Sequence, residues 1–421
     1  MAIEGIHKPR NSLTNPRGHS LKLAALFASA ALALAAPTAA HAQLTKEYQQ
    51  LQEFGAVLDH AATAPDFVGL AVAVVKDGQV ALVKTYGVRE AGGTEKVTPD
   101  TVFRIASLSK GFAGTLAVME QKDGKLDLQT RVATIVPEFK LRRAADAARV
   151  TLEDVLSQRT GLPPYAYDNL LEAGRTPSVI LSEYAKVKQT CPPGECFTYQ
   201  NVAFNMIAAA IEKASGKPYA AELKARILDP LDMKTASLGL AQLKSTGNWA
   251  RPHKRAGQTW VSTPVTDWYY RVPAAGGVNA SITDLSKWLV AQIGLRPDVI
   301  PQAVLDEAHR KRIATPPETA RQRALKTPVT ETSYGLGWRN YTYAGKRVIT
   351  HSGSVEGYIA QIAWVPETRS GIVVLSNTRG ARAARIVPAW LDYELGLQKT
   401  DWFKMDEITT ASGAAATASG D

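Results

Sequence analysis

The stretch that decides the fold begins at Ser107, where Ser107-Leu108-Ser109-Lys110 opens an apolar run over residues 111–119. It is the only Ser-x-x-Lys in the 421 residues. Residues three apart share a face of a helix, so the Ser107 hydroxyl and the Lys110 amine can meet without a distant segment. A lysine whose charge is disfavoured by burial or by a neighbouring cation can take a serine's proton. The spacing therefore predicts an activated serine, although a capping Ser107 with a solvated Lys110 fits these four residues equally well.

The composition is that of an ordinary globular chain with a sizeable core. Hydrophobic residues make up 45% and charged residues 21%, and the length suits two domains or one large domain with an insertion. The formal net charge is +10. Because the basic residues are scattered and form no stripe interleaved with aromatics, we expect no nucleic-acid partner.

The first 42 residues have the pattern of a secretory signal peptide. Four basic residues precede an uninterrupted run of apolar and small residues at 23–36, and the small-x-small triplet Ala40-His41-Ala42 follows. The run is too short to span a bilayer comfortably. We expect a periplasmic or extracellular protein with no stable membrane span after cleavage; an uncleaved N-terminal anchor is the alternative.

The chain has two cysteines, in Cys191-Pro192-Pro193-Gly194-Glu195-Cys196. In an exported protein an even count predicts a disulfide, and the Pro-Pro-Gly turn can bring the two Cα atoms into range. So short a loop removes little entropy from the unfolded chain, so its effect would be local. Two spectator thiols are the alternative. A metal site lacks the matching His or Cys pair, so none is predicted.

Strands are predicted at both ends of the chain and helices between them. Residues 67–75 and 79–88 read as a hairpin about Asp77-Gly78, and residues 341–343, 347–352, 358–365 and 372–376 read as further strands. Helices are predicted at 107–121, 151–157, 202–214, 283–293 with Thr283 as cap, and 381–395. This predicts an α/β (α+β) fold: one antiparallel sheet assembled from both termini and flanked by helices. The domain would span 43–397, with a mainly helical insertion over approximately 125–270. Residues 398–421 would form a disordered tail, since 407–421 hold few large apolar side chains.

Tyr199-Gln200-Asn201 directly precedes the helix predicted at residue 202. A phenol beside a lysine can share general-base and general-acid work, and the Asn201 amide can hydrogen-bond a substrate amide. A plain N-cap is the alternative for Asn201. Tyr167-Asp168-Asn169 has the same pattern, but it lies in a proline-rich connection and opens no clear helix, so Tyr199 is preferred.

His351-Ser352-Gly353-Ser354 ends a strand that begins near residue 347. A strand edge beside a nucleophile can bind an extended substrate through its main chain, and a glycine permits close approach of backbone. A backbone N–H beyond the glycine, together with that of Ser107, can form an oxyanion hole. A polar turn at a strand end is the alternative. Arg159-Thr160-Gly161 imitates the triad but precedes Tyr199, so its order is wrong.

These three motifs, in this order, resemble those of the class C β-lactamase-like serine hydrolases. The group includes penicillin-binding DD-peptidases, D-aminopeptidases and β-lactamase-like esterases. The resemblance covers residues 45–397 and extends to connecting segments, which are 152–163, 230–233, 275–277, 283–285 and 357–358. It implies an α/β domain of antiparallel sheet with flanking helices, a mainly helical domain, and an active site between them.

The resemblance also implies roles for individual residues. Ser107 would be the acylated nucleophile, Lys110 its proton partner and Tyr199 a general base and acid, while the N–H groups of Ser107 and Ser354 would hold the oxyanion. No cofactor or metal is implied. His351 stands where true β-lactamases usually carry lysine, which is more like DD-peptidases and the broader hydrolases. A histidine also holds a substrate carboxylate more weakly at pH 7.

The sequence thus predicts an exported serine hydrolase that cleaves amides or esters through an acyl-enzyme. A peptide or D-amino-acid amide is the favoured substrate, with peptidoglycan fragments as one source. A carboxylesterase follows. A true class C β-lactamase comes third, because His351 stands where such enzymes usually carry lysine and residue 200 is Gln where a small residue is common. A non-catalytic penicillin-binding sensor or scaffold is the alternative outside enzymology.

Overall fold

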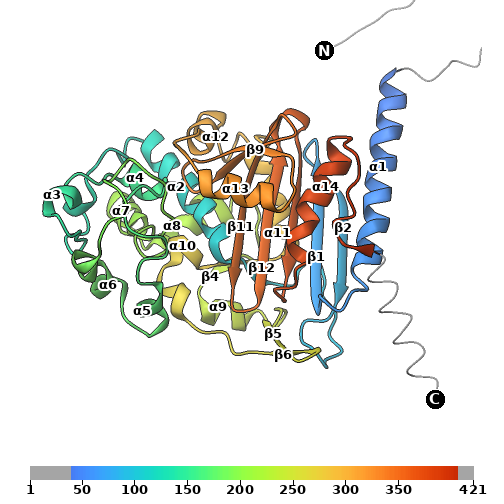
Figure 1. Ribbon diagram of the computed structural model, residues 1–421, viewed down its shortest axis with the longest axis horizontal. Helices are drawn as coiled ribbons and strands as arrows, with labels where there is room; N and C mark the ends of the chain where they lie inside the picture. The colour runs from blue at the N-terminus through green and yellow to red at the C-terminus, as the bar shows by residue number, and fades with distance from the viewer. Residues whose placement is uncertain (1–38, 406–421) are drawn as a thin grey trace, which may run out of the picture. The chain divides into compact units, whose positions relative to one another are not determined.

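The computed structural model describes residues 39–405 (Figure 1). Residues 46–405 form one compact unit, and the described residues before it are the first seven of helix α1 (Ala39–Ala61). Of the predicted signal peptide, residues 1–38 lie outside the described residues. Within residues 39–405, none of the helices combines the length and apolar character that a membrane crossing requires.

An eight-stranded antiparallel sheet forms the centre of the unit. The order across the sheet is β2 (Gln79–Gly87), β1 (Gly69–Lys76), β13 (Ser370–Ser376), β12 (Tyr358–Val365), β11 (Lys346–Val355), β10 (Arg339–Tyr343), β9 (Val329–Tyr334) and β8 (Ile313–Ala314). The N-terminal strand β1 pairs with the last strand, β13, from Leu70 opposite Ser376 to Lys76 opposite Ser370. The prediction of one sheet built from both termini is therefore confirmed.

Two of the hairpins close through the tight turns that their sequences predict. Asp77 and Gly78 between β1 and β2 have φ of 48° and 80°, and Ala344 and Gly345 between β10 and β11 have 47° and 79°. Two successive positive φ values define the type I′ turn, whose twist matches that of the flanking strands. Asp-Gly is a favoured sequence for this turn, which is why its position could be predicted.

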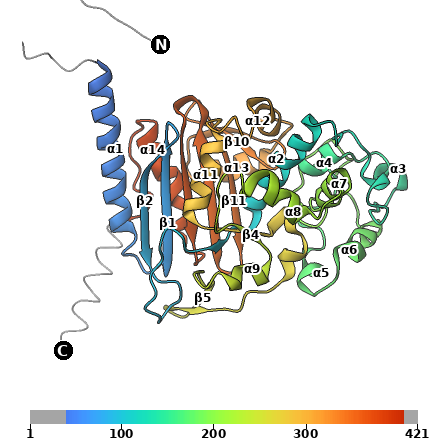
Figure 2. The same ribbon diagram turned by 180° about the vertical axis from the view of Figure 1, so that it is seen from behind.

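Both faces of the sheet are covered, and β1 shows why its sequence is apolar throughout. Leu70, Val72 and Val74 pack with Phe54 of α1 and with α14 (Ile386–Glu394), whereas the alternate residues 71, 73 and 75 pack towards α2 (Ser109–Lys122) and α11 (Ile282–Gln292). Side chains alternate between the faces of a strand, so a strand covered on both sides lacks a polar face. Figures 1 and 2 show α14 and α11 on opposite faces.

The middle of the chain supplies a mainly helical region beside the sheet, at the β8–β10 side (Figure 1). Its helices are short apart from α7, and they are α3 (Ala144–Ala147), α4 (Leu152–Leu156), α5 (Asp168–Glu172), α6 (Pro177–Glu183), α7 (Met206–Ser215) and α8 (Tyr219–Leu223). One continuous apolar core joins this region to α2 and α11.

The remaining elements surround the sheet. They are a small sheet of β3 (Phe103–Arg104), β7 (Val278–Ala280) and β4 (Ser237–Leu238); a hairpin of β5 (His253–Ala256) and β6 (Thr259–Ser262); and helices α9 (Leu240–Ser245), α10 (Pro273–Gly276), α12 (Gln302–His309) and α13 (Pro316–Ala324). The 3₁₀ turn η1 (Ala106–Leu108) leads directly into α2.

Several predicted boundaries are wrong, including the start of the final helix, which is Ile386 instead of about residue 381. The helix expected from 202 begins at Met206, because residues 201–205 form tighter turns such as Met206 N–H to Ala203 C=O at 3.2 Å. Helix α11 is capped by Ser281, whose hydroxyl accepts from the Asp284 N–H at 3.2 Å, and not by Thr283. The tail was set too early at 398, since Trp402 and Phe403 are buried against the core; residues 406–421 lie outside the described residues.

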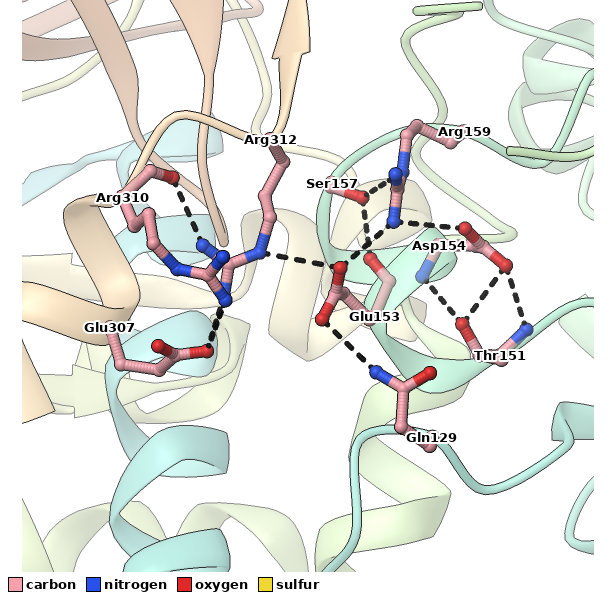
Figure 3. A network of polar contacts seen from close by, with 9 residues as sticks. All are labelled: Gln129, Thr151, Glu153, Asp154, Ser157, Arg159, Glu307, Arg310 and Arg312. Carbon is pink, nitrogen blue, oxygen red and sulfur yellow. Dashed lines mark hydrogen bonds and ion pairs between the residues drawn. The ribbon is translucent and has the colours of Figure 1, made fainter. Parts of the chain in front are cut away.

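A network of charged side chains joins the helical region to the sheet (Figure 3). Glu153 of α4 forms two ion pairs, one with Arg312 at 3.3 Å and one with Arg159 at 3.0 Å. Arg312 directly precedes β8. Arg312 also pairs with Glu307 of α12. Arg312 is nearly buried, so its charge is compensated by carboxylates from both regions. The network therefore fixes the position of α4 relative to the sheet. α4 ends two residues before Gln158, whose side chain holds the loop at residue 200.

Candidate active site

The predicted nucleophile lies at a sharply bent turn that carries it to the surface. Ala106 has φ of 49°, outside the usual range for a non-glycine residue, and Ser107 is the one partly exposed residue between positions 101 and 110. The second serine of the motif holds this turn: the Ser109 hydroxyl donates to Ala106 C=O at 2.7 Å and accepts from Val278 N–H at 3.0 Å. Ser109 therefore has a structural use that the motif alone did not reveal.

Lys110 is fully buried, and its amine faces Ser107. Its Nζ lies 3.4 Å from Ser107 Oγ, 2.6 Å from Asn201 Oδ1 and 3.1 Å from Ala275 C=O. Burial lowers the pKa of Lys110 to about 7; Asp168 opposes this shift and Arg339 adds to it. With an ordinary pKa near 10.4, only about one amine in 2,500 would be neutral at pH 7, whereas a pKa of about 7 corresponds to about half.

Counting donors explains what a neutral Lys110 can do. A neutral amine has two N–H donors and one lone pair, whereas an ammonium has three donors and no acceptor. Asn201 Oδ1 and Ala275 C=O are acceptors, and the two N–H groups can bond to them. The lone pair can then face the third neighbour, the Ser107 hydroxyl 3.4 Å away. This hydroxyl accepts from the ammonium form of Lys110 and can donate to the neutral form. This arrangement lets Lys110 accept the serine proton.

Tyr199 lies beside both residues. Lys110 Nζ sits 4.7 Å from the centre of its ring. Burial raises the pKa of Tyr199 to about 12, while Arg339 and a hydrogen bond with Ser107 lower it. The phenol is therefore neutral near pH 7, and it can pass a proton in either direction without carrying a stable charge.

The backbone on both sides of residue 200 is held by a glutamine that sequence reasoning missed. Gln158 Oε1 accepts from the Gln200 N–H at 2.7 Å, and Gln158 Nε2 donates to Gln200 C=O at 3.1 Å. Gln200 Nε2 in turn donates to Pro163 C=O at 2.6 Å. Gln200, which stands where the resemblance leads us to expect a small residue, thus faces into the loop. Gln158, at φ 63° and fully buried, positions the chain that carries Tyr199.

The assignment of Tyr199, and not Tyr167, to the site can be tested by replacing each tyrosine with phenylalanine. In Tyr199→Phe we expect the acylation rate to fall about 100-fold, the lower end of the general acid-base range, because Lys110 remains beside Ser107. Tyr167→Phe should stay close to wild type, since its ring stacks on Tyr184 with the ring centres 6.0 Å apart and phenylalanine keeps that ring. Stopped-flow acylation with a nitrophenyl ester measures both. The reverse order of effects would show that the wrong tyrosine has been assigned.

Asn201 faces the interior. Its Oδ1 accepts from Lys110, and its Nδ2 donates to Asp168 Oδ2 at 2.6 Å. The sequence analysis assigned the Asn201 amide to the substrate, and the structure places it between two protein groups. Asp168 belongs to the Tyr167-Asp168-Asn169 segment, and the prediction that this segment opens no clear helix is wrong, because α5 begins at Asp168.

Strand β11 brings the third motif against Ser107. A Cβ on Gly353 would lie 2.2 Å from Ile105 C=O and 2.8 Å from Ser107 N. β10 pairs only with residues 346–350 of β11, so along that side the stretch 351–355 has no strand partner among the described residues. The side chains of Ser352 and Ser354 are exposed, whereas His351 and Gly353 face inward. This leaves main-chain groups at an unpaired edge beside the nucleophile.

The close approach at Gly353 leads to a prediction. Gly353→Ala should displace Ser107 and lower the acylation rate about 100-fold, the scale for a misplacement of about 1 Å. We expect a loss in free energy of unfolding of about 1–3 kcal/mol from overpacking. Gly55→Ala is the control, because a Cβ there meets Leu82 and Lys84 at an ordinary 3.8 Å. An active, stable Gly353→Ala protein would refute the close contact; acylation kinetics and thermal unfolding measure both effects.

His351 carries no charge near neutral pH. Its Nε2 lies 3.0 Å from the Tyr334 hydroxyl and its Nδ1 2.9 Å from Ser352 C=O. Burial, Arg339 and Lys110 hold the pKa of His351 well below its ordinary value. A substrate carboxylate would therefore find no cation at this residue.

The permanent cation of the site is Arg339, which the sequence analysis did not single out. Its guanidinium lies 5.5 Å from the ring centres of both Tyr199 and Tyr334. Its one ion pair among the described residues is with Glu318 of α13, at 3.8 Å. Arg339 is the first residue of β10, and no local motif marks it, so only the sheet register brings it here.

The disulfide between Cys191 and Cys196 is present, which confirms that prediction, with Cα atoms 6.2 Å apart. Its loop packs on Gly161, where a Cβ would lie 2.3 Å from Cys191 C=O. Arg159 C=O accepts from Gly194 N–H at 2.8 Å. The Arg159-Thr160-Gly161 segment, which resembles the third motif in sequence, therefore packs against the disulfide loop and supports it.

Comparison with known proteins gives one family. The family model described as Beta-lactamase matches residues 48–395. A protein named unguisins hydrolase ungD', from Aspergillus campestris, is 27% identical over 346 residues, covering 78% of this chain and 61% of that protein. Protein flp of Staphylococcus aureus is 24% identical over 82% of this chain and 66% of its own length. The chain thus spans less than two thirds of these curated relatives.

Two solved structures share the fold. An octameric penicillin-binding protein homologue from Pyrococcus abyssi aligns with a TM-score of 0.72 at 24% identity, covering 83% of this chain and 78% of that one. A structure described as SurE aligns with a TM-score of 0.64 at 22% identity, covering 85% and 78%. The mixed architecture of antiparallel sheet and helices is therefore the one predicted.

Proposed function

Because this chain belongs to the β-lactamase family, we propose that it is a serine hydrolase that works through an acyl-enzyme on Ser107. The observation that carries the proposal is the buried Lys110 amine, 3.4 Å from Ser107 Oγ and with a pKa of about 7. A structural lysine has no need of a nearby hydroxyl and a free lone pair. General-base activation of a weak nucleophile needs both.

The chemistry follows from these positions. Ser107 Oγ attacks the substrate carbonyl while its proton moves to Lys110 Nζ, giving a tetrahedral oxyanion. Tyr199 then conveys that proton to the leaving amine or alcohol, the carbon–leaving-group bond breaks, and Ser107 is left acylated. The N–H groups of Ser107 and Ser354 would hold the oxyanion. The contact of Gly353 with Ser107 N supports this, because it brings the β11 backbone to that point.

A substrate with a carboxylate, such as a D-amino-acid peptide, is favoured. Arg339 puts a permanent positive charge beside Tyr199, and its distant ion pair with Glu318 leaves donors for a second partner. Peptidoglycan fragments have this chemistry. A carboxylesterase or a β-lactamase would use the same nucleophile, but a simple ester makes no use of Arg339.

The substrate class is tested by a matched pair. A D-Ala-D-Ala peptide with a free carboxylate should be cleaved faster than the same peptide with a C-terminal amide. Short nitrophenyl esters and nitrocefin complete the panel. Equal rates on acid and amide, or turnover of the esters alone, would contradict the peptidase assignment and favour the esterase.

We also propose that the mature protein acts outside the cytoplasm. The basic leader and apolar run of the first 42 residues and the disulfide support this location, since disulfides persist in oxidising compartments. Fractionation of cells that produce the full chain tests it. Recovery of uncleaved protein in the cytosolic fraction would contradict it.

A further inference from the structure

We propose that Asp168 is a positioning residue for acylation, which fixes the orientation of the Asn201 amide so that its carbonyl oxygen faces Lys110. The proposal rests on the proposed function, because it assigns a purpose to the amine of Lys110. Asp168 lies in a segment that the three family motifs do not include. Its contact with the site is through Asn201, at 2.6 Å.

The two ends of an asparagine side chain have nearly the same size, so shape alone permits either orientation. Only the carbonyl end can accept the Lys110 N–H at 2.6 Å. A flipped Asn201 would present N–H donors to the amine and compete with Ser107 for its lone pair.

A carboxylate on the other side removes this ambiguity. Burial raises the pKa of Asp168, while the hydrogen bond with Asn201 and the charge of Lys110 oppose that shift and favour the ionised form. When ionised, aspartate only accepts hydrogen bonds, so it bonds to Asn201 Nδ2 and repels Oδ1. The Lys110 donors and the Asp168 acceptor thus demand the same orientation from opposite ends. An asparagine at 168 could donate as well as accept, and it would permit both orientations of Asn201.

The surroundings of Asp168 argue against a purely structural role. The residue is 7% exposed, and its Oδ1 has no hydrogen-bond partner among the described residues. Its Oδ2 is shared between Asn201 and the Tyr269 hydroxyl, which lies 3.4 Å away and bonds better to Glu172 at 2.9 Å. A buried carboxylate with an unpaired oxygen is costly, and a neutral amide would lower that cost.

The segment that carries Asp168 is itself held in an unusual shape. Tyr165 and Tyr167 both have positive φ, 56° and 57°. The Tyr165 N–H donates to Tyr199 C=O at 2.8 Å, so the segment is tied to the motif it supports. Such backbone strain persists where the surrounding structure demands it, and it gathers at functional sites.

The charge of Asp168 gives the proposal a signature in the pH profile. The charged groups around the Lys110 amine are Asp168, which raises its pKa, and Arg339, which lowers it; Ser107, Tyr199, Asn201 and His351 face it uncharged. Glu172 and the hydroxyls of Tyr184 and Tyr269 lie around Asp168. Removing the negative charge should lower the pKa of Lys110 further. The acid limb of the pH profile, which is the range where the acylation rate rises as Lys110 loses its proton, should therefore move to lower pH.

The test compares Asp168→Asn with wild type in single-turnover acylation by a nitrophenyl ester between pH 5 and 9. We expect the plateau rate to fall about 10- to 100-fold, as for a slightly misplaced catalytic group, and the acid limb to shift towards acid. Glu172→Gln is the control: it is a neighbouring carboxylate that does not touch Asn201, and it should keep both rate and limb. A residue needed only for folding would change thermal unfolding but not the limb.

Two further variants make the test decisive. Asp168→Glu keeps the charge but moves the acceptor, so the limb should stay in place while the plateau falls; it also serves if Asp168→Asn does not fold. In an Asn201→Ala background, Asp168→Asn should lower the plateau by less than about twofold, since its target is gone. Full-rate Asp168→Asn or Asp168→Glu, or additive losses, would overturn the proposal. Absence of any Ser107 adduct in wild type would instead refute the proposed function.

Discussion

Replacing Ser107 by alanine should lower hydrolysis of every substrate in the panel about 10⁶-fold, the scale on which loss of a nucleophile acts. The expectation follows from the position of Ser107, which is the partly exposed residue of an otherwise buried stretch and lies next to the Lys110 amine. Without its hydroxyl no acyl-enzyme can form, and Lys110 has no proton to accept. Steady-state rates of purified protein, corrected for folded fraction, measure the loss.

The control for this variant is Ser182→Ala, at an exposed position of α6 where the hydroxyl bonds only to Ser178 C=O, at 3.2 Å, among the described residues. It should retain the wild-type rate. Substantial activity in Ser107→Ala would mean that another group is acylated, or that water is activated directly. Either finding would remove the basis of the mechanism.

Lys110→Met should lower the acylation rate by about 10²–10⁴-fold, the range for a general acid-base group. Methionine keeps the length and apolar stem of the side chain but has no basic lone pair. The wild-type rate should rise about tenfold per pH unit up to a pKa near 7, because only the neutral amine accepts the Ser107 proton. In Lys110→Met this acid limb should disappear, which a pH series of acylation rates will show.

Lys122→Met is the control for the second prediction. Lys122 ends the same helix but is exposed, so its loss should change neither the rate nor the limb. An acid limb that persists in Lys110→Met would assign the titrating group elsewhere. Since the pKa of His351 lies well below its ordinary value, His351 would not account for a limb near 7.

The fold could be predicted from the sequence where local patterns of residues, such as turns and apolar runs, indicate the elements. The Asp77-Gly78 turn and the apolar runs of the last strands predicted the two halves of the sheet, and their neighbouring positions followed from the arrangement of strands at both ends. Helix starts were less secure. Residues 202–204 are apolar and suit a helix, but the Asn201 side chain bonds to Lys110 and Asp168 instead of capping one.

The site was predictable where its residues lie in short motifs. Ser107 and Lys110 are one turn apart, so their proximity needs no tertiary information. Arg339, Gln158 and Asp168 were missed because their roles depend on chain segments that meet only in the folded protein. Asp168 reaches the site through Asn201, 33 residues away. The one signal available was the repeated Tyr-Asp/Gln-Asn pattern at 167–169, which was set aside as a competitor of the true motif.

The most direct test is to treat the purified protein with a fluorophosphonate and map the adduct by mass spectrometry across a pH series. The account predicts one phosphonyl group per chain, on Ser107, formed at a rate that is half-maximal near pH 7. It also predicts no adduct in Ser107→Ala. Labelling of a different residue, or labelling of Ser107 at a rate that stays flat from about pH 5 to 9, would contradict the claim that Lys110 activates this serine.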